Sequence, residues 1–195
     1  ENCAVAAFNF LETLGGEEYA KEMVVKRPGV LATPLRTLEG AWHALESVVG
    51  DKDALKLVQK TGAVLTSPGS TMLGTFDILI NIFGKELALK LVRKSPSLLK
   101  VAEPTMNGAW DYLVDLVGYE AAVELCERCP NVLSAPEATM RGSHDALQKI
   151  FSDDMAVTLV KKNPAVLKAP KETVNSAWKV LQEVLGEDAH TAVVN

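Results

Sequence analysis

A recurring interval of 34 residues limits what this chain can fold into more than any other feature. Leucine returns at every step of that length, at Leu11, Leu45, Leu79, Leu113, Leu147 and Leu181. A second series is aromatic with one histidine, and it runs through Phe8, Trp42, Phe76, Trp110, His144 and Trp178. A fixed period of this length is the signature of a repeat architecture, so each motif has to be interpreted within its copy.

Each copy encodes a longer helix, expected over about 34–49. Its apolar residues recur at the three- and four-residue spacing of one helical face. Gly50 is placed to close this helix in a left-handed conformation. Thr33 before Pro34 is expected to cap its start with a hydroxyl, as Ser67 does in the next copy.

A shorter helix follows, expected over about 51–60, and it ends at a residue that interrupts helices. That place is taken by Pro28, Gly62, Pro96, Pro130 and Pro164. The apolar pair after it, such as Val30 and Leu31, is expected to form a short turn beneath the stack.

Four glycines lie inside the longer helices, at Gly40, Gly74, Gly108 and Gly142. Each costs roughly 0.5–1 kcal/mol relative to alanine. We expect close helix contact to compensate, because a residue without a side chain lets a neighbouring backbone approach. A groove for a ligand is the alternative use of such a stripe.

One two-helix unit cannot cover its own apolar face, so successive units have to stack. The sequence therefore predicts an all-α fold, a right-handed α-solenoid of about five 34-residue two-helix repeats in a single domain, 1–195. The predicted boundaries are a partial first repeat at 2–16, full repeats at 17–50, 51–84, 85–118, 119–152 and 153–186, and a remnant at 187–195.

Charge and hydropathy narrow the function classes. The chain has 20 Lys and Arg against 25 Asp and Glu, a net charge of -5, which argues against a surface devoted to nucleic-acid backbones. No apolar run approaches the roughly 20 residues of a membrane span, so the chain is expected not to cross a bilayer, although a place beside one stays open. It begins at Glu1, which indicates either a removed targeting segment or a trimmed longer protein.

The order of proline, leucine, long helix, glycine and short helix resembles the mitochondrial transcription termination factor family. The positions that carry the resemblance are Pro28–Leu31, Leu45, Gly50, Gly62–Leu65, Pro96–Leu99, Leu113, Gly118 and Pro130–Leu133. The resemblance implies an organellar helical solenoid that binds nucleic acid along a basic face, and the acidic balance departs from that pattern. The tetratricopeptide repeat shares the period and Trp42 with Leu45, but Glu46 stands where its glycine belongs.

The repeat style also resembles helical linker subunits of the chlorophyll-binding antennae of algal photosystems. That resemblance implies a plastid, thylakoid-associated location in preference to a mitochondrial one. It also implies that His43 or His144 ligates a chlorophyll magnesium through a neutral ring nitrogen. Taken alone, the three isolated histidines are expected to be surface or capping groups.

A basic residue occupies one position in every copy, at Lys26, Lys60, Lys94, Arg128 and Lys162. Repeat proteins that read nucleic acid place equivalent side chains against successive nucleotides. The competing interpretation is that each cation lies in the last turn of a short helix, where the helix dipole favours it by roughly 0.3–1 kcal/mol.

Cys126 and Cys129 form a C-x-x-C pair, but Cys126 occupies the apolar position of Val24, Val58, Val92 and Val160. We therefore expect a buried packing residue and neither a redox thiol nor a metal ligand. Three cysteines do not make a disulfide framework, which favours a reducing compartment.

No catalytic motif or phosphate-binding glycine loop is recognised. The sequence thus predicts a non-enzymatic scaffold or linker that holds the protein subunits of a larger organellar assembly. An organellar nucleic-acid binder is the alternative.

Overall fold

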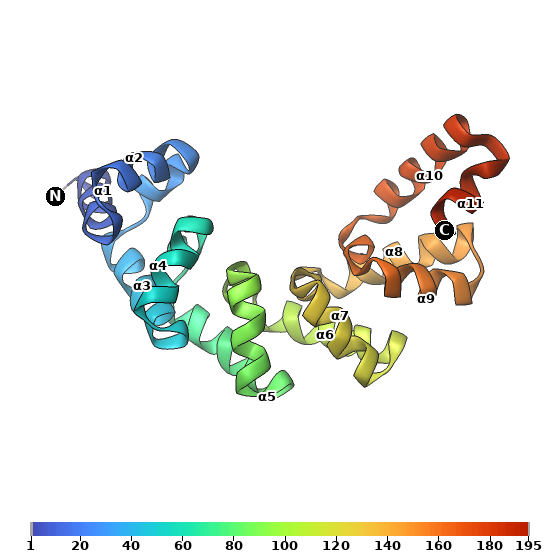
Figure 1. The fold of residues 1–195 in the computed structure, drawn as a ribbon, viewed down its shortest axis with the longest axis horizontal. Coiled ribbons are helices and arrows are strands. Elements are labelled where there is room, and N and C mark those ends of the chain that lie inside the picture. Colours follow the sequence, from blue (N-terminus) through green and yellow to red (C-terminus); the bar gives the residue numbers. More distant parts are fainter. Residues whose placement is uncertain (1, 195) are drawn as a thin grey trace. The chain divides into compact units, whose positions relative to one another are not determined.

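The computed structural model describes residues 2–194, and every regular element within them is a helix (Figure 1). This confirms the all-α class. The chain divides into two compact units, Glu1–Glu103 and Pro104–Asn195, and each is described separately.

The first unit repeats a long helix, a short helix and a 3-10 turn. Its elements are α1 (Cys3–Gly15), α2 (Glu17–Lys26), η1 (Pro28–Ala32), α3 (Leu35–Val49), α4 (Asp51–Lys60), η2 (Gly62–Thr66), α5 (Gly69–Lys94) and η3 (Pro96–Lys100). The bounds of α3 and α4 agree with the predicted helices at 34–49 and 51–60 to within one residue.

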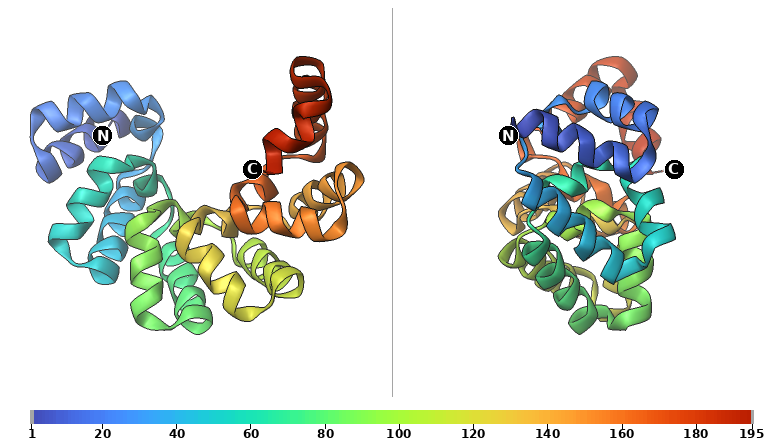
Figure 2. Two further views of the ribbon diagram at one scale, coloured as in Figure 1. Left: turned by 45° about the vertical axis from the view of Figure 1, so that its right-hand side comes forward. Right: turned by 90° about the vertical axis from the view of Figure 1, so that its left-hand side faces the viewer.

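The second unit has the same order. Its elements are α6 (Glu103–Val117, beginning at the last residue of the first unit), α7 (Tyr119–Arg128), η4 (Pro130–Ser134), α8 (Glu137–Ile150), α9 (Asp153–Lys162), η5 (Pro164–Lys168), α10 (Lys171–Leu185), η6 (Gly186–Asp188) and α11 (Ala189–Val194). Consecutive long and short helices pair as hairpins, as α3 and α4 do in Figure 1 and in the two further views of Figure 2.

The recurrent leucine forms the centre of each hairpin. Leu11, Leu45, Leu79 and Leu113 are completely buried, and Leu147 is 5% exposed. Burying one leucine side chain stabilises a fold by about 1.5–3 kcal/mol. The 3-10 turns add to the same layer, since Val64 and Leu65 of η2 are completely buried, as predicted for the short apolar turn.

Glycine closes the hairpins with a backbone that other residues avoid. Gly16, Gly50, Gly84 and Gly118 have φ between 75° and 85° and ψ between 156° and 172°. The positive φ of Gly50 was predicted, but its ψ lies far from the left-handed helix, in a region that is essentially confined to glycine. Gly84 interrupts α5 in this way and divides it into two helices, 69–83 and 85–94.

The predicted hydroxyl caps at Thr33 and Ser67 are wrong. Thr33 ends η1, where its N–H donates to the Val30 carbonyl and its Oγ1 donates to the Gly29 carbonyl at 3.4 Å. Pro34 is the residue that precedes α3, and its carbonyl accepts the first helical hydrogen bond. Ser67 likewise ends η2. The 3-10 turn reaches further along the chain than the sequence indicated, so each hydroxyl belongs to the turn.

The glycines inside the long helices lie where the next long helix begins, in three cases of four. The α5 helix begins at Gly69, where a Cβ atom would overlap the Gly40 carbonyl oxygen. A Cβ on Gly108 would lie 3.4 Å from the Cβ of Glu137, and one on Gly142 would lie 3.8 Å from the Cβ of Lys171. Gly74 is the exception, because nothing lies within 4 Å of its Cβ position.

Among the described residues, no helix combines the length and the apolar character that crossing a membrane requires.

Candidate functional site

His144 is buried in the second unit, although isolated histidines were expected at the surface. It lies on α8 with 7% of its surface exposed, and its Nε2 atom is enclosed with no hydrogen-bond partner. Its ring meets Tyr112 of α6 edge to face, with 6.5 Å between ring centroids. The cause is its place in the aromatic series, where the side chain points to the neighbouring long helix. The expectation of a surface or capping histidine is therefore wrong here.

Charged side chains surround this pair. The Arg141 guanidinium lies 4.7 Å above the Tyr112 ring, and its Nε donates to the Glu137 carboxylate at 2.7 Å. Tyr112, Arg141 and His144 border an open hollow that is also lined by Asp115, Leu116 and Asp145. Burial lowers the pKa of His144 and raises the pKa of Tyr112 to about 12. His144 is thus held as the neutral imidazole.

His43 has the opposite setting. It lies on α3 in the first unit with 74% of its side chain exposed, and its Nδ1 is 3.1 Å from the Glu46 carboxylate. The His43 ring is therefore accessible, whereas the Nε2 atom of His144 is enclosed. Within the described part of the chain, no group of three or more His, Cys, Asp or Glu side chains is placed so that it could hold a metal ion.

The third histidine, His190 of α11, belongs to an aromatic cluster. Its ring centroid lies 4.7 Å from that of Trp178 and 5.1 Å from that of Phe151, both at steep angles. Sequence reasoning missed this cluster because Phe151 and His190 belong to different positions of the repeat.

The basic series lies where it was predicted, in the last turn of each short helix. Lys26, Lys60, Lys94, Arg128 and Lys162 all occupy that turn. The Arg128 guanidinium donates to the carbonyls of Lys161 and Lys162, the last two residues of α9. A cation bound to the carboxyl end of a helix favours the dipole interpretation for this member. The Lys26 ammonium pairs with Glu22 of its own helix.

Cys126 is completely buried on α7, as the sequence predicted. Burial raises the pKa of its thiol to about 12, and the neighbouring Cys129 adds to the effect. The thiolate is the nucleophilic and metal-binding form, so Cys126 is held in its unreactive form at neutral pH. Cys129 is half-buried at the end of α7.

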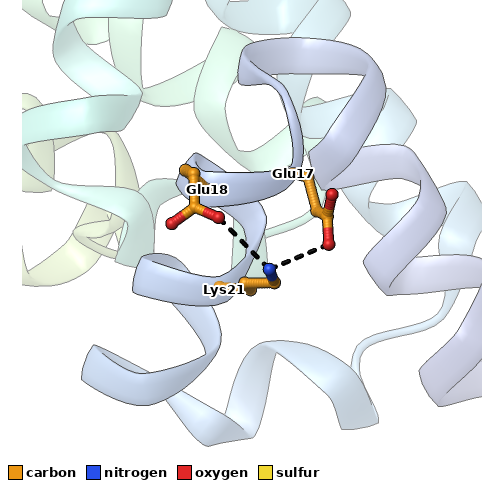
Figure 3. A network of polar contacts seen from close by, with 3 residues as sticks. All are labelled: Glu17, Glu18 and Lys21. Carbon is orange, nitrogen blue, oxygen red and sulfur yellow. Dashed lines mark hydrogen bonds and ion pairs between the residues drawn. The ribbon is translucent and has the colours of Figure 1, made fainter.

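The outer faces of the short helices carry ion pairs. On α2 the Lys21 ammonium lies 2.8 Å from Glu17 and 3.2 Å from Glu18 (Figure 3). The pair lowers the pKa of Glu17 and raises that of Lys21. A contact between two copies forms where Arg93 of α5 lies 3.0 Å from Asp53 of α4. Such exposed pairs contribute little to stability because solvent screens their charges.

One surface position of the long helices differs in nearly every copy. It is exposed or half-buried throughout and is occupied by Val5, Glu39, Leu73, Asn107, Arg141 and Asn175. The buried leucine position, by contrast, never changes. This is the arrangement that suits recognition, because side chains of different chemistry stand at equivalent places on a constant framework. This variable position could have been found from the sequence by looking for positions at which the copies differ.

The second unit also carries an aromatic pair that is partly exposed. Trp110 of α6 and Tyr119 of α7 meet edge to face with 5.6 Å between centroids, and Tyr119 is 54% exposed. Aromatic side chains with one polar end are enriched at protein interfaces.

The architecture defines a class, an all-helical protein whose long-helix and short-helix hairpins repeat. A comparison with models of known protein families finds no match, and a comparison with curated proteins finds none either.

Proposed function

We propose that this protein is a non-enzymatic scaffold in which the two units continue as one right-handed α-solenoid of about five 34-residue repeats. Its exposed side chains hold the protein subunits of a larger organellar assembly. The observation that carries the proposal is the contrast between Leu45, Leu79 and Leu113, which are constant and buried, and the equivalent exposed position, which changes from Glu39 to Leu73 to Asn107.

The favoured assembly is a photosystem antenna supercomplex in a plastid, with the chain beside the thylakoid membrane. The repeat style, the net charge of -5 and the row of differing surface residues support this choice. A scaffold needs a stable framework and a varied surface, and the hairpins supply both.

The test is a comparison of four forms of the tagged protein, the wild type and three variants, in intact complexes isolated from its native source. The wild type is expected to co-purify with defined subunits. Leu73→Asp and Tyr119→Ala, which change an exposed apolar and an exposed aromatic side chain, are expected to lose them. Val25→Asp, at an 81% exposed position on α2, is the matched control. Recovery of the wild type alone contradicts the proposal.

Chlorophyll is a separate part of this proposal and rests on the two histidines. Pigment extraction from the purified complex is expected to yield chlorophyll that His43→Ala lowers, because its ring nitrogen is accessible. His144→Phe keeps an aromatic ring and tests the buried site in the same way. Pigment content that neither variant changes removes both histidines as ligands.

An organellar nucleic-acid binder of the termination-factor type is the second candidate, favoured by the basic residue in the last turn of α2, α4, α5, α7 and α9. Lys60→Ala tests it in a gel-shift titration, with Lys52→Ala on the same helix as the control. Arg128 is unsuitable because it also binds the end of α9. Phosphate contacts weaken steeply as salt rises, and a probe that stays unshifted at low salt rejects this candidate.

A further inference from the structure

The hollow bordered by Tyr112, Arg141 and His144 lies wholly within the second unit and has a volume of about 440 Å³. This volume falls within the range of roughly 300–1,000 Å³ that small-molecule sites occupy. The side chains that line the hollow all belong to two long helices, α6 and α8. The hollow is therefore built into the helical framework.

The hollow carries more negative charge than the chain compensates. The carboxylates of Glu137 and Asp145 act on the Tyr112 side chain, and that of Asp115 acts on the Arg141 guanidinium. Arg141 donates to Glu137. Asp115 and Asp145 are exposed, and neither makes an ion pair or hydrogen bond with another residue of the described part of the chain. Two negative charges thus remain without a partner at the hollow.

A buried histidine is the second sign of an absent partner. His144 lines the hollow with 7% of its surface exposed, and its Nε2 atom has no hydrogen-bond partner. Burying a polar atom in this way costs free energy. Packing does not require it, because the other copies have a phenylalanine or tryptophan at this position, namely Phe8, Trp42, Phe76, Trp110 and Trp178.

The first unit shows that the framework does not need this polar lining. In place of Tyr112, Asp115, Arg141, His144 and Asp145, the equivalent positions of α3 and α5 hold Ala44, Ser47, Leu73, Phe76 and Asp77. Ala44 is 4% exposed and Phe76 is 8% exposed. The same part of the repeat is therefore packed with apolar side chains in one unit and lined by polar ones in the other.

The groups without a partner define the chemistry of a ligand. Two carboxylates attract a cation, and a neutral imidazole has one nitrogen that accepts a hydrogen bond. The outer side-chain torsion of histidine is broad, so a turn of the ring brings Nε2 of His144 to a donor in the hollow. A planar guanidinium has five N–H donors and serves several acceptors at once, whereas an ammonium is more strongly hydrated. Arg141 already behaves in this way, since it lies over Tyr112 and donates to Glu137.

We propose that the hollow lined by α6 and α8 binds the guanidinium group of a ligand. Asp115 and Asp145 pair with its charge, His144 accepts one of its N–H groups, and Leu116 contacts the alkyl stem. This goes beyond the proposed scaffold role, because it assigns a site for one chemical group within the second unit. The guanidinium belongs either to a free small molecule or to an arginine side chain of another protein, and the test separates these sources.

The test is a titration of the purified, isotope-labelled full chain with butylguanidinium at neutral pH and low salt, followed by the NMR shifts of the backbone amides. Saturable shifts are expected at residues 112–116 and 141–145, with a dissociation constant on the order of 1 mM, because the ligand is small and makes few contacts. Butylurea has nearly the same shape without the charge, and it is expected to give no saturable shift. Butylammonium is expected to bind more weakly than butylguanidinium.

Substitutions of the lining test each contact. Asp115→Asn and Asp145→Asn each remove one charge with little change of shape and are expected to weaken binding about fivefold. His144→Phe keeps a ring, as the other copies do, and is expected to weaken binding about threefold by removing the acceptor. Glu124→Gln removes an exposed carboxylate of α7 outside the hollow and is expected to leave binding unchanged. Circular dichroism checks that each variant is folded.

A blocked glycine–arginine–glycine peptide identifies the source of the guanidinium. If the peptide binds more tightly than butylguanidinium, the natural ligand is an arginine side chain of another protein, and if it binds more weakly, the ligand is a free small molecule. The proposal is overturned if butylguanidinium gives no saturable shift or if butylurea binds equally well. It is also overturned if the two aspartate variants or His144→Phe bind as tightly as the wild type.

Discussion

The hairpin of α8 and α9 and the hairpin of α10 and α11 follow one another in the same unit, yet they differ in how well their long helix is covered. Leu147 of α8 is 5% exposed, whereas Leu181 of α10 is half-buried. Ser143 is completely buried and donates from Oγ to the Val166 carbonyl of η5 at 2.8 Å, whereas its equivalent, Ala177, is exposed. The same leucine is therefore placed differently by what surrounds it.

The short helices of the two hairpins also differ. The residue of α9 that meets the long helix is Ala156, which is completely buried, as are its equivalents Ala20, Ala54, Ala88 and Ala122. His190 occupies this position in the last copy. The α11 helix begins at Ala189, which is 1% exposed and takes the buried place one residue earlier. In the last copy the buried alanine therefore lies one residue earlier in the repeat than in the other copies.

An apolar groove of about 200 Å³ lies beside α10. Its lining includes residues of α8, η5, α10 and α11, among them Leu147, Val166, Trp178, Leu181 and Val193. In the preceding copy the 3-10 turn η5 covers the equivalent side of α8. In the α8 hairpin, where the leucine is buried, a small alanine of the short helix and the following 3-10 turn both pack against the long helix.

The strongest test of this difference in burial is to replace the leucine with alanine at a buried position and at the half-buried position of α10. Leu113→Ala, at a completely buried position of α6, is expected to lower the free energy of unfolding by about 2–5 kcal/mol, because it removes the side chain and leaves a cavity. Leu181→Ala is expected to cost about 1 kcal/mol, since its site is open and can relax. Urea unfolding measures both, and equal losses contradict the difference in burial.

The alanine column is tested by exchanging its residues. Ala156→His places in α9 the residue that α11 carries, and it is expected to cost about 3 kcal/mol through overpacking and burial of a polar ring. The converse change, His190→Ala, removes ring contacts with Trp178 and Phe151 worth about 0.5–1.5 kcal/mol. Thermal unfolding followed by circular dichroism compares the two. An Ala156→His protein as stable as the wild type shows that alanine does not set the register.

A smaller difference in stability is expected from the residue that joins the two helices of a hairpin, which is glycine in one copy and serine in another. Gly118, between α6 and α7, has φ 84° and ψ 161°, so Gly118→Ser is expected to cost about 1–3 kcal/mol in backbone strain. Ser152, between α8 and α9, has φ -68°, and its Oγ accepts from the Met155 N–H at 3.4 Å. Ser152→Gly is therefore expected to cost only a few tenths of a kcal/mol. Chemical unfolding of the exchanged pair checks this, and similar costs refute the assignment of strain to Gly118.

Most of this fold can be predicted from the sequence, because each residue can be compared with the residues at the same position of the other copies. The buried leucines, the positive φ of Gly50 and the burial of Cys126 all follow from position in the copy. Thr33 was misassigned because a hydroxyl before a proline looks the same at the end of a 3-10 turn and at the start of a helix. Only three-dimensional contacts decide between the two.

The candidate site was less predictable. The basic series was placed correctly in the last helical turn, but the carbonyls that Arg128 reaches lie in another copy, more than 30 residues away along the chain. His144 was expected at the surface because the prediction considered only that it is an isolated histidine. Its position in the repeat, where the other copies have aromatic residues, indicated a packed ring. Contacts between copies and the environment of a single polar residue depend on coordinates that no periodicity contains.

The smallest expected effect concerns the pH dependence of stability and arises from His144. This residue distinguishes α8 from α10, where the same position is Trp178. Burial lowers the pKa of His144 below its ordinary value of 6.5, so near that pH the unfolded chain binds more protons than the folded one. Its contribution to stability is therefore present above about pH 6.5 and is lost as the pH falls through that value.

His144→Phe keeps the ring and removes the titration, and it is expected to flatten the dependence of the free energy of unfolding on pH between about 7.5 and 5.5. His43→Phe, which changes an exposed histidine in the same way, is the matched control. Urea unfolding at a series of pH values measures the slopes, and an unchanged slope in His144→Phe means that the burial of this histidine carries no pH-dependent cost.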